Sequence, residues 1–251
     1  MFNLNSKVIL ITGGSRGIGA ACVKYFSMAG ACVAFTYNSN FAAASKIEKR
    51  FSKITKCKAY KVDINNEEEI KNTVSAVIKD FGGIDVLVNN AGIWKEGKIS
   101  KMKLSAWEET IKTNLTSAFL FTQHVIRFMK IKRYGKIINI SSTAGQRGEA
   151  HYSHYAASKG GMISFTKSLA SELGQFNINV NSVAPGWVLT DMSKNALSNK
   201  KNLDEELKKI PLGRIATADD IAGPVLFLAS DLSRHINGEI LNVNGGSVLV
   251  G

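Results

Sequence analysis

The segment Val8–Gly19 limits the possible folds of this chain more than any other. Its continuous apolar run, Val8–Ile11, predicts a parallel strand that is covered on both faces. A glycine-rich loop follows, and residues 20–28 then predict a helix that ends at Gly30. A strand, a glycine loop and a helix in this order are the opening of a dinucleotide-binding unit.

The glycines of this loop have separate predicted tasks. Gly13 and Gly17 allow the backbone to turn tightly and to approach a pyrophosphate, and Gly19 allows the helix to pack closely on the sheet. The amino end of the helix favours the anion. The spacing Gly-x-x-x-Gly-x-Gly differs from the common Gly-x-Gly-x-x-Gly, so an ordinary glycine turn is the alternative, although the flanking strand and helix argue against it.

Strands and helices alternate along the rest of the chain, which predicts an α/β fold with a Rossmann-type, doubly wound parallel sheet. The length of 251 residues suits a single domain, residues 1–251. Residues 191–210 are polar, lysine-rich and weakly helical, which is the profile of a mobile lid, so we expect a lid at about 191–213. The further predicted strands are 31–37, 59–64, 84–88, 137–140, 178–184 and 239–243, and the further predicted helices are 41–53, 67–80, 104–131, 153–173 and 218–229.

The formal charge of +12 comes mostly from lysines that are scattered over the whole chain. A solvated, lysine-rich surface is the simpler interpretation. Attraction of acidic partners, such as a phosphorylated cofactor or an acidic protein, is the alternative. The chain has no helix-turn-helix, zinc-finger or RNA-binding signature, so we expect no nucleic-acid role.

The sequence also bears on the compartment. No apolar run reaches the roughly 18 residues of a membrane span, and the first residues lack the pattern of a signal peptide. The cysteines, Cys22, Cys32 and Cys57, are odd in number and have no metal-ligand spacing, which is typical of reduced cysteines in a cytosolic protein. We therefore expect a cytoplasmic protein with no membrane contact and no metal.

The end of the second predicted strand bears on the choice of cofactor. An acidic residue there would hydrogen-bond a free ribose 2′-hydroxyl, but residues 37–40 are neutral, Asn38 among them. Arg16 lies in the glycine loop, where its guanidinium could pair with a 2′-phosphate. These residues favour NADP(H) over NAD(H). The alternative is that Arg16 points to solvent.

Polar residues follow two further strands. Asp63, at the exit of the third strand, could accept a hydrogen bond from an adenine amino group or cap the helix 67–80, and both interpretations are equally open. Asn90, Ala91 and Gly92 follow the fourth strand, where an amide and small residues suit a loop that lines a cofactor crevice.

Tyr155 and Lys159 carry the predicted chemistry. They lie four residues apart in a predicted helix and so share one face, where the ammonium is expected to lower the pKa of the phenol. Such a pair is a plausible general acid for a carbonyl oxygen. Ser142 lies in a hydroxyl-rich loop thirteen residues earlier. A lone Tyr-x-x-x-Lys is a weak signal, and a solvated helix face is the alternative.

Asn114 interrupts the predicted helix 104–131. An asparagine inside a helix is mildly unfavourable and can bond to the local backbone. It is either a tolerated polar residue or the site of a bend that opens a carbonyl to water near an active site.

In this order and spacing the residues resemble the classical short-chain dehydrogenase/reductase family over essentially the whole chain. Within the family the chain is most similar to the bacterial 3-oxoacyl-[acyl-carrier-protein] reductases. The motifs that carry the resemblance are Thr12-Gly13-x-x-x-Gly17-x-Gly19, Asn89-Asn90-Ala91-Gly92, Asn114, Ser142, Tyr155-x-x-x-Lys159 and Pro185-Gly186, with the stretches Trp107–Leu115, Asn139–Ser142, Pro185–Met192 and Val243–Gly246.

The resemblance implies a role for each catalytic position. Tyr155 would donate a proton to a ketone oxygen, and Ser142 would hold that oxygen in place. Lys159 would bond the nicotinamide ribose and lower the pKa of Tyr155, while Asn114 would hold a water that links Lys159 to solvent. The further implied cofactor contacts are Ser15, Ile18, Asn38, Ile64 and Gly186, with Pro185, Val188 and Thr190 at the nicotinamide end.

The resemblance also implies a substrate and an assembly. We expect NADPH-dependent reduction of a 3-oxoacyl thioester, on an acyl carrier protein or coenzyme A, to the 3-hydroxyacyl form, as in fatty acid biosynthesis. We expect a homotetramer that pairs through the helices 104–131 and 153–173 and through the C-terminal strand.

Two departures from the family pattern leave the substrate open. Arg133 matches one of the basic residues that would meet an acidic carrier near the substrate entrance, but Phe176 stands where the second arginine is usual. The loop Ile93–Gly97 replaces a commoner, aspartate-containing run. Both could mean a sugar, a steroid or another small alcohol or ketone. A non-catalytic dinucleotide sensor is the remaining alternative, but it has no need of the catalytic residues.

Overall fold

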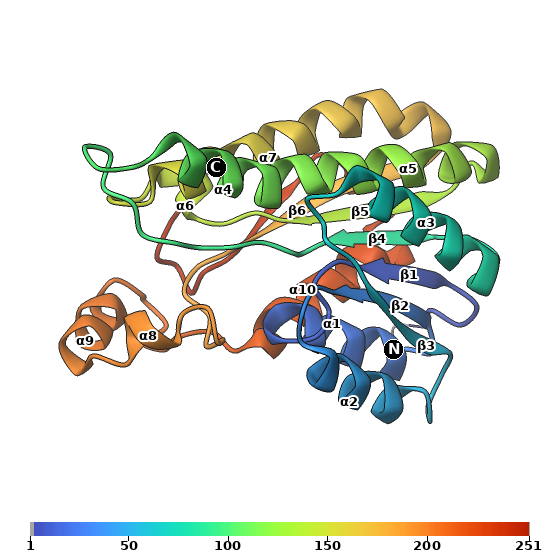
Figure 1. The fold of residues 1–251 in the computed structure, drawn as a ribbon, viewed down its shortest axis with the longest axis horizontal. Coiled ribbons are helices and arrows are strands. Elements are labelled where there is room, and N and C mark those ends of the chain that lie inside the picture. Colours follow the sequence, from blue (N-terminus) through green and yellow to red (C-terminus); the bar gives the residue numbers. More distant parts are fainter. Residues whose placement is uncertain (1–2, 251) are drawn as a thin grey trace.

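A computed structural model describes residues 3–250 as one parallel sheet with helices on both faces (Figure 1). The seven strands have the order β3-β2-β1-β4-β5-β6-β7, and all neighbours are parallel. The chain thus winds outward in both directions from β1 and β4, which confirms the doubly wound, Rossmann-type fold. The strands are β1 (Val8–Ile11), β2 (Cys32–Tyr37), β3 (Cys57–Lys61), β4 (Val86–Asn89), β5 (Gly135–Ile140), β6 (Ile178–Pro185) and β7 (Ile240–Val243).

Helices form a layer on each side of the sheet. They are α1 (Gly17–Met28), α2 (Phe41–Phe51), α3 (Glu67–Phe81), α4 (Leu104–Ile111), α5 (Ser117–Lys132), α6 (Ala144–Arg147), α7 (Ser153–Leu173), α8 (Lys194–Leu197), α9 (Lys200–Lys208) and α10 (Ala218–Ala229). Ile9 and Ile11 of β1 pack with α1, α2 and α10, whereas Val8 and Leu10 pack with α3, α5 and α7. Successive side chains of a strand point to opposite faces, so an unbroken apolar run serves both layers.

The loop after β3 begins earlier than predicted. β3 ends at Lys61 rather than at residue 64, because Lys61 pairs with Tyr37, the last residue of β2. Asp63 therefore lies in the loop. The side chain of Asn66 caps α3 by accepting hydrogen bonds from N–H groups of its first turn. The capping role considered for Asp63 is wrong.

The predicted helix 104–131 is not regular throughout. A π-helical segment, Lys112–Thr116, joins α4 to α5, and the N–H of Ser117 bonds there to the carbonyl of Lys112. Asn114 lies in this segment and is fully buried. Single π turns inside α-helices are frequent at functional sites. The prediction of one regular helix is wrong in this segment, and the departure falls at Asn114.

α8 and α9 stand apart from the sheet, on the side to which the strand arrows point (Figure 1). Leu197, Ile210 and Ile215 form a small buried cluster of their own in this part of the chain. The role of the segment as a lid stays a prediction. Within residues 3–250, no helix combines the length and the apolar character that crossing a membrane requires.

Candidate active site

A cleft of about 760 Å³ opens at the carboxyl ends of the strands. Its lining runs from the loops after β2 and β3, past the glycine loop, to the loops after β5 and β6. Ligands of open α/β sheets bind in this position. The predicted site residues that line the cleft are Gly13, Ser15, Arg16, Gly17, Ile18, Asn38, Ile64, Asn90, Ala91, Gly92, Ser142, Tyr155, Lys159, Pro185, Gly186, Val188 and Thr190, whereas Gly19, Asp63 and Asn114 lie outside the lining.

The glycine loop has backbone conformations that other residues rarely adopt. Gly13 has a φ of +69° and Gly17 a φ of +53°. A Cβ at Gly13 would lie 3.1 Å from the Cα of Ala91, and a Cβ at Gly17 would lie 3.3 Å from Cγ2 of Thr190. A Cβ at Gly19 would collide with the carbonyl oxygen of Gly13. Gly19 therefore packs closely against the backbone of Gly13 and the side chain of Asn90.

Hydrogen bonds tie the glycine loop to the loop after β4. Asn90 Nδ2 donates to the carbonyls of Thr12 and Gly13 at 2.9 and 3.2 Å. Thr12 Oγ1 accepts hydrogen bonds from the N–H groups of Asn90 and Ala91 at 2.9 and 3.0 Å. These four hydrogen bonds hold both loops together as one cradle.

The end of the cleft near β2 suits an anion. None of its lining residues at positions 36–40 is acidic, and exposed Arg16 stands beside them in the lining. Arg16 takes part in none of the ion pairs found within residues 3–250. It is the N-cap residue of α1, which has neither a side-chain cap nor an acidic residue in its first turn. The free N–H groups of such a helix end favour a phosphate.

Asp63 does not line the cleft, although its neighbours Val62 and Ile64 do. Its carboxylate accepts a hydrogen bond from the N–H of Asn65 at 2.9 Å. An adenine contact of Asp63 stays a prediction.

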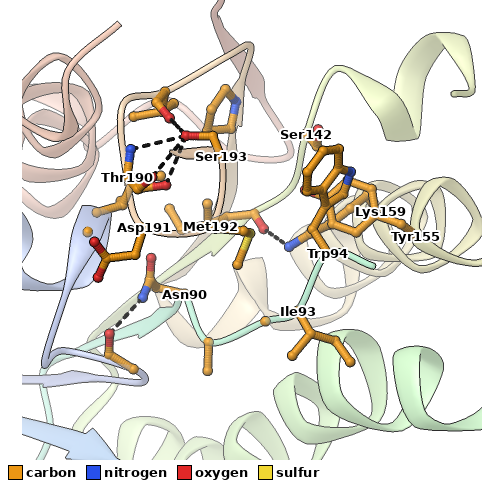
Figure 2. Close-up of a pocket in the computed structure, with 18 of the residues that line it drawn as sticks. Asn90, Ile93, Trp94, Ser142, Tyr155, Lys159, Thr190, Asp191, Met192 and Ser193 are labelled. Atoms are coloured by element: carbon orange, nitrogen blue, oxygen red, sulfur yellow. Dashed lines mark hydrogen bonds between the residues drawn. The ribbon is translucent and has the colours of Figure 1, made fainter. Parts of the chain in front are cut away.

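The catalytic residues gather at the opposite end of the cleft (Figure 2). Tyr155 and Lys159 lie one turn apart in α7, and Ser142 lies in the loop after β5. Lys159 is only 4% exposed, and its Nζ donates a hydrogen bond to the Ile140 carbonyl at 2.7 Å. The same Nζ lies 5.8 Å from the centre of the Tyr155 ring.

Burial sets the protonation of this pair. Loss of hydration raises the pKa of Tyr155 to about 12, although a hydrogen bond with Ser142 acts in the opposite direction. Burial also lowers the pKa of Lys159 from 10.5 to about 8. The expected lowering of the Tyr155 pKa by Lys159 is wrong in this structure, because desolvation dominates and Lys159 is not among the groups that shift this pKa. Tyr155 therefore keeps its proton near neutral pH, as a general acid must.

Asn114 clamps two parts of the site together. Its Oδ1 accepts a hydrogen bond from the Ile93 N–H at 2.8 Å, and its Nδ2 donates to the Ile93 carbonyl at 3.0 Å. Nδ2 also donates to Ser158 Oγ, in α7, at 3.1 Å. A Cβ at Gly92 would lie 3.1 Å from Asn114 Oδ1 and 3.8 Å from Lys159 Nζ. Asn114 thus holds the loop after β4 against the catalytic helix, and its role in holding a water stays a prediction.

Several lining residues at the catalytic end were not predicted from the sequence, among them four that carry a ring or a carboxylate. They are Trp94, Glu149, Trp187 and Glu206. The available signal was weak: Trp94 lies in the loop that departs from the family pattern, and Trp187 follows Gly186. Glu149 and Glu206 carried no signal, because only the folded chain brings the loop after β5 and α9 to one cleft.

Arg133 lies at the amino ends of the strands, whereas the cleft lies at their carboxyl ends. It follows α5, and its Nη2 donates to the Gln175 carbonyl at 2.8 Å. β5 begins just after Arg133, and Ser142 follows the far end of that strand. A strand of six residues spans roughly 20 Å at about 3.3 Å per residue. The expectation that Arg133 lies close to the substrate entrance is wrong within this chain.

A glycine cradle and a Ser–Tyr–Lys group in one cleft of a Rossmann-type sheet define an oxidoreductase that uses a nicotinamide dinucleotide and acts on a ketone. The positive-φ glycines fit that cofactor, because a side chain on either would fill the cradle. The family model described as Enoyl-(Acyl carrier protein) reductase matches residues 13–247. The chain belongs to the short-chain dehydrogenase/reductase family.

Relatives of known name match nearly the whole chain. The 3-oxoacyl-[acyl-carrier-protein] reductase FabG of Aquifex aeolicus is 42% identical over 245 residues, which cover 97% of this chain and 98% of that protein. The acetoacetyl-CoA reductase of Shinella zoogloeoides is 41% identical, over 98% and 100% of the two chains. A putative gluconate dehydrogenase from Agrobacterium tumefaciens has a similar solved structure, with a TM-score of 0.95 and 30% identity over 100% of this chain and 99% of that one.

Proposed function

We propose that this chain reduces a 3-oxoacyl thioester to the 3-hydroxyacyl form with NADPH. The observation that carries the proposal is the convergence of Ser142, Tyr155 and Lys159 at one end of a cleft that contains the glycine cradle. The names of the two reductases, which match at least 97% of the chain, support this substrate class.

The residues divide the chemistry between them. Bound NADPH would supply a hydride to the ketone carbon. Tyr155 donates its phenolic proton to the ketone oxygen, and Ser142, which lines the same end of the cleft, holds that oxygen. Lys159 stabilises the tyrosinate that forms, because its ammonium is fixed on the Ile140 carbonyl beside the ring. The ketone gains one hydride and one proton and becomes a hydroxyl group.

Charge supports NADPH over NADH. Arg16 provides a guanidinium at the end of the cleft where a 2′-phosphate would lie, and Asn38 stands where a carboxylate would repel that phosphate. Gly13 and Gly17 would admit the pyrophosphate between them.

The carrier of the acyl group is an acyl carrier protein or coenzyme A, and the reaction would serve fatty acid biosynthesis. The formal charge of +12 supports an acidic carrier by attraction over the whole surface, without a role for Arg133. Oxidation of a sugar or another small alcohol is the second candidate, which the likeness to the putative gluconate dehydrogenase favours.

One substrate panel tests the proposal. NADPH oxidation is followed with acetoacetyl thioesters of coenzyme A and of an acyl carrier protein and with cyclic ketones, and NADP⁺ reduction is followed with sugars and gluconate. We expect the highest kcat/KM with an acetoacetyl thioester and NADPH. A higher kcat/KM with a sugar would overturn the proposal in favour of the second candidate.

A further inference from the structure

At the catalytic end of the cleft, Trp94 contacts two aromatic side chains that come from other loops. The ring of Trp94 stacks on that of Tyr152 with centroids 4.4 Å apart and planes 4° apart. The edge contact of Trp94 with Trp187 has centroids 5.6 Å apart and planes at 86°. Such separations are the contact distances of aromatic pairs, so no channel remains between the rings. We call Trp94, Tyr152 and Trp187 the aromatic wall.

A carboxylate and ring contacts hold the indoles in place. Trp187 Nε1 donates to Glu206 Oε2 at 2.7 Å, and the other oxygen of Glu206 accepts a hydrogen bond from Lys209 at 2.7 Å. Glu149, whose pKa burial raises, lies with Trp94 in the lining of the cleft. Trp187 cannot turn aside without breaking its hydrogen bond, and Trp94 cannot turn aside without breaking its stacking on Tyr152.

The aromatic wall lies at the end of the cleft where the ketone must bind. Trp94 follows β4 and Trp187 follows β6, while Ser142 follows β5, the strand between them. Both tryptophans line the cleft together with Tyr155. Figure 2 shows Trp94 at the same end as Ser142, Tyr155 and Lys159, away from Asn90.

We propose that the aromatic wall limits the acyl chain, so that this enzyme takes short 3-oxoacyl thioesters, such as acetoacetyl, and excludes long ones. This inference rests on the proposed function. A 3-oxoacyl thioester has two arms beside its ketone. The thioester arm must leave through the mouth of the cleft toward its carrier, so the acyl arm meets the wall. A short arm contacts the rings, whereas a long arm finds no gap between them.

The test compares acetoacetyl-, 3-oxooctanoyl- and 3-oxododecanoyl-coenzyme A by NADPH oxidation. In the unmodified enzyme kcat/KM should fall at least roughly tenfold from the shortest to the longest substrate, since one misfitting methylene costs about 10- to 200-fold. Trp94→Ala should open the wall and raise the ratio of long-chain to acetoacetyl kcat/KM by about tenfold or more. Trp94→Phe keeps a ring and should change this ratio less.

Trp107→Ala is the matched control. Trp107 lies on α4 outside the cleft, so its loss should leave the chain-length ratio unchanged. If Trp94→Ala does not fold, as judged by circular dichroism and NADPH binding, Trp94→Leu takes its place. Equal reduction of short and long chains by the unmodified enzyme, or an unchanged ratio after truncation of Trp94, would overturn the inference.

Failure of the proposed function has a different signature. If none of the tested thioesters supports NADPH oxidation by the unmodified enzyme, the proposed function is wrong. The wall is then judged with cyclohexanone and the bulkier decalone. A relative gain for decalone in Trp94→Ala supports a size limit at the wall, and no gain overturns it.

Discussion

Replacing Lys159 with Met should have an effect on stability that changes sign with pH. Lys159 is 4% exposed, and burial lowers its pKa from 10.5 to about 8. At about 1.4 kcal/mol per pKa unit, keeping this ammonium in the folded protein costs about 3 kcal/mol. Met removes that cost but leaves the Ile140 carbonyl without its donor, which costs about 2 kcal/mol. Near neutral pH Lys159→Met should therefore be about 1 kcal/mol more stable than the unmodified protein.

The advantage should disappear as the pH rises. Above pH 8 the folded protein releases the Lys159 proton, while the unfolded chain keeps it up to about 10.5, so the unmodified protein gains stability over this interval. Near pH 10.5 the lost hydrogen bond is the only remaining difference between the two proteins, and Lys159→Met should be about 2 kcal/mol less stable than the unmodified protein.

Urea unfolding followed by circular dichroism at a series of pH values, without added NADPH, measures this difference. Lys167→Met is the matched control, because Lys167 is exposed on the same helix and its ammonium stays in water. The control should follow the unmodified protein at every pH. A stability difference for Lys159→Met that stays constant between neutral pH and pH 10.5 would refute the reasoning.

Three further predictions concern catalysis, cofactor and assembly. Tyr155→Phe removes the proton donor, so kcat should fall by about 10²- to 10⁴-fold while fluorescence titration gives an unchanged Kd for NADPH; activity within about tenfold of the unmodified enzyme would contradict the role of Tyr155. Asn38→Asp should shift the ratio of kcat/KM for NADPH and NADH by roughly tenfold toward NADH, because the new carboxylate repels the 2′-phosphate. A preference of the unmodified enzyme for NADH would show that Arg16 does not bind the 2′-phosphate. Light scattering should show a tetramer, since Phe119 is 43% and Ile131 84% exposed on α5 and β7 is an edge strand, whereas a 27.2 kDa species at micromolar concentration would count against assembly.

The sheet and the catalytic helix were predictable because their signals are local. The apolar run Val8–Ile11 serves both layers of the sheet, as its composition indicates. Helix α7 begins and ends at the predicted residues, 153 and 173. Tyr155 and Lys159 share a face of that helix by spacing alone.

Features that depend on distant segments were not predictable in the same way. The pKa of Tyr155 follows from burial, which the sequence around it does not determine. Asn114 has partners 21 and 44 residues away, so only its disturbance of the helix was visible. Arg133 was misplaced because its match to a family position carried no information about strand direction. Trp94 and Trp187 meet only after β4 and β6 have taken their places beside β5.

The π turn at Lys112–Thr116 depends on the number of residues in this segment. A deletion of one residue there would allow α4 and α5 to join as a regular helix. Each helical residue turns the chain by about 100°, so everything on one side of the deletion would rotate by that angle. Phe121 anchors α5 in the core, so the rotation would fall on Asn114 and would break its bonds to Ile93. A loss of one residue in the segment would therefore make the helix more regular while it destroys the clamp that Asn114 forms.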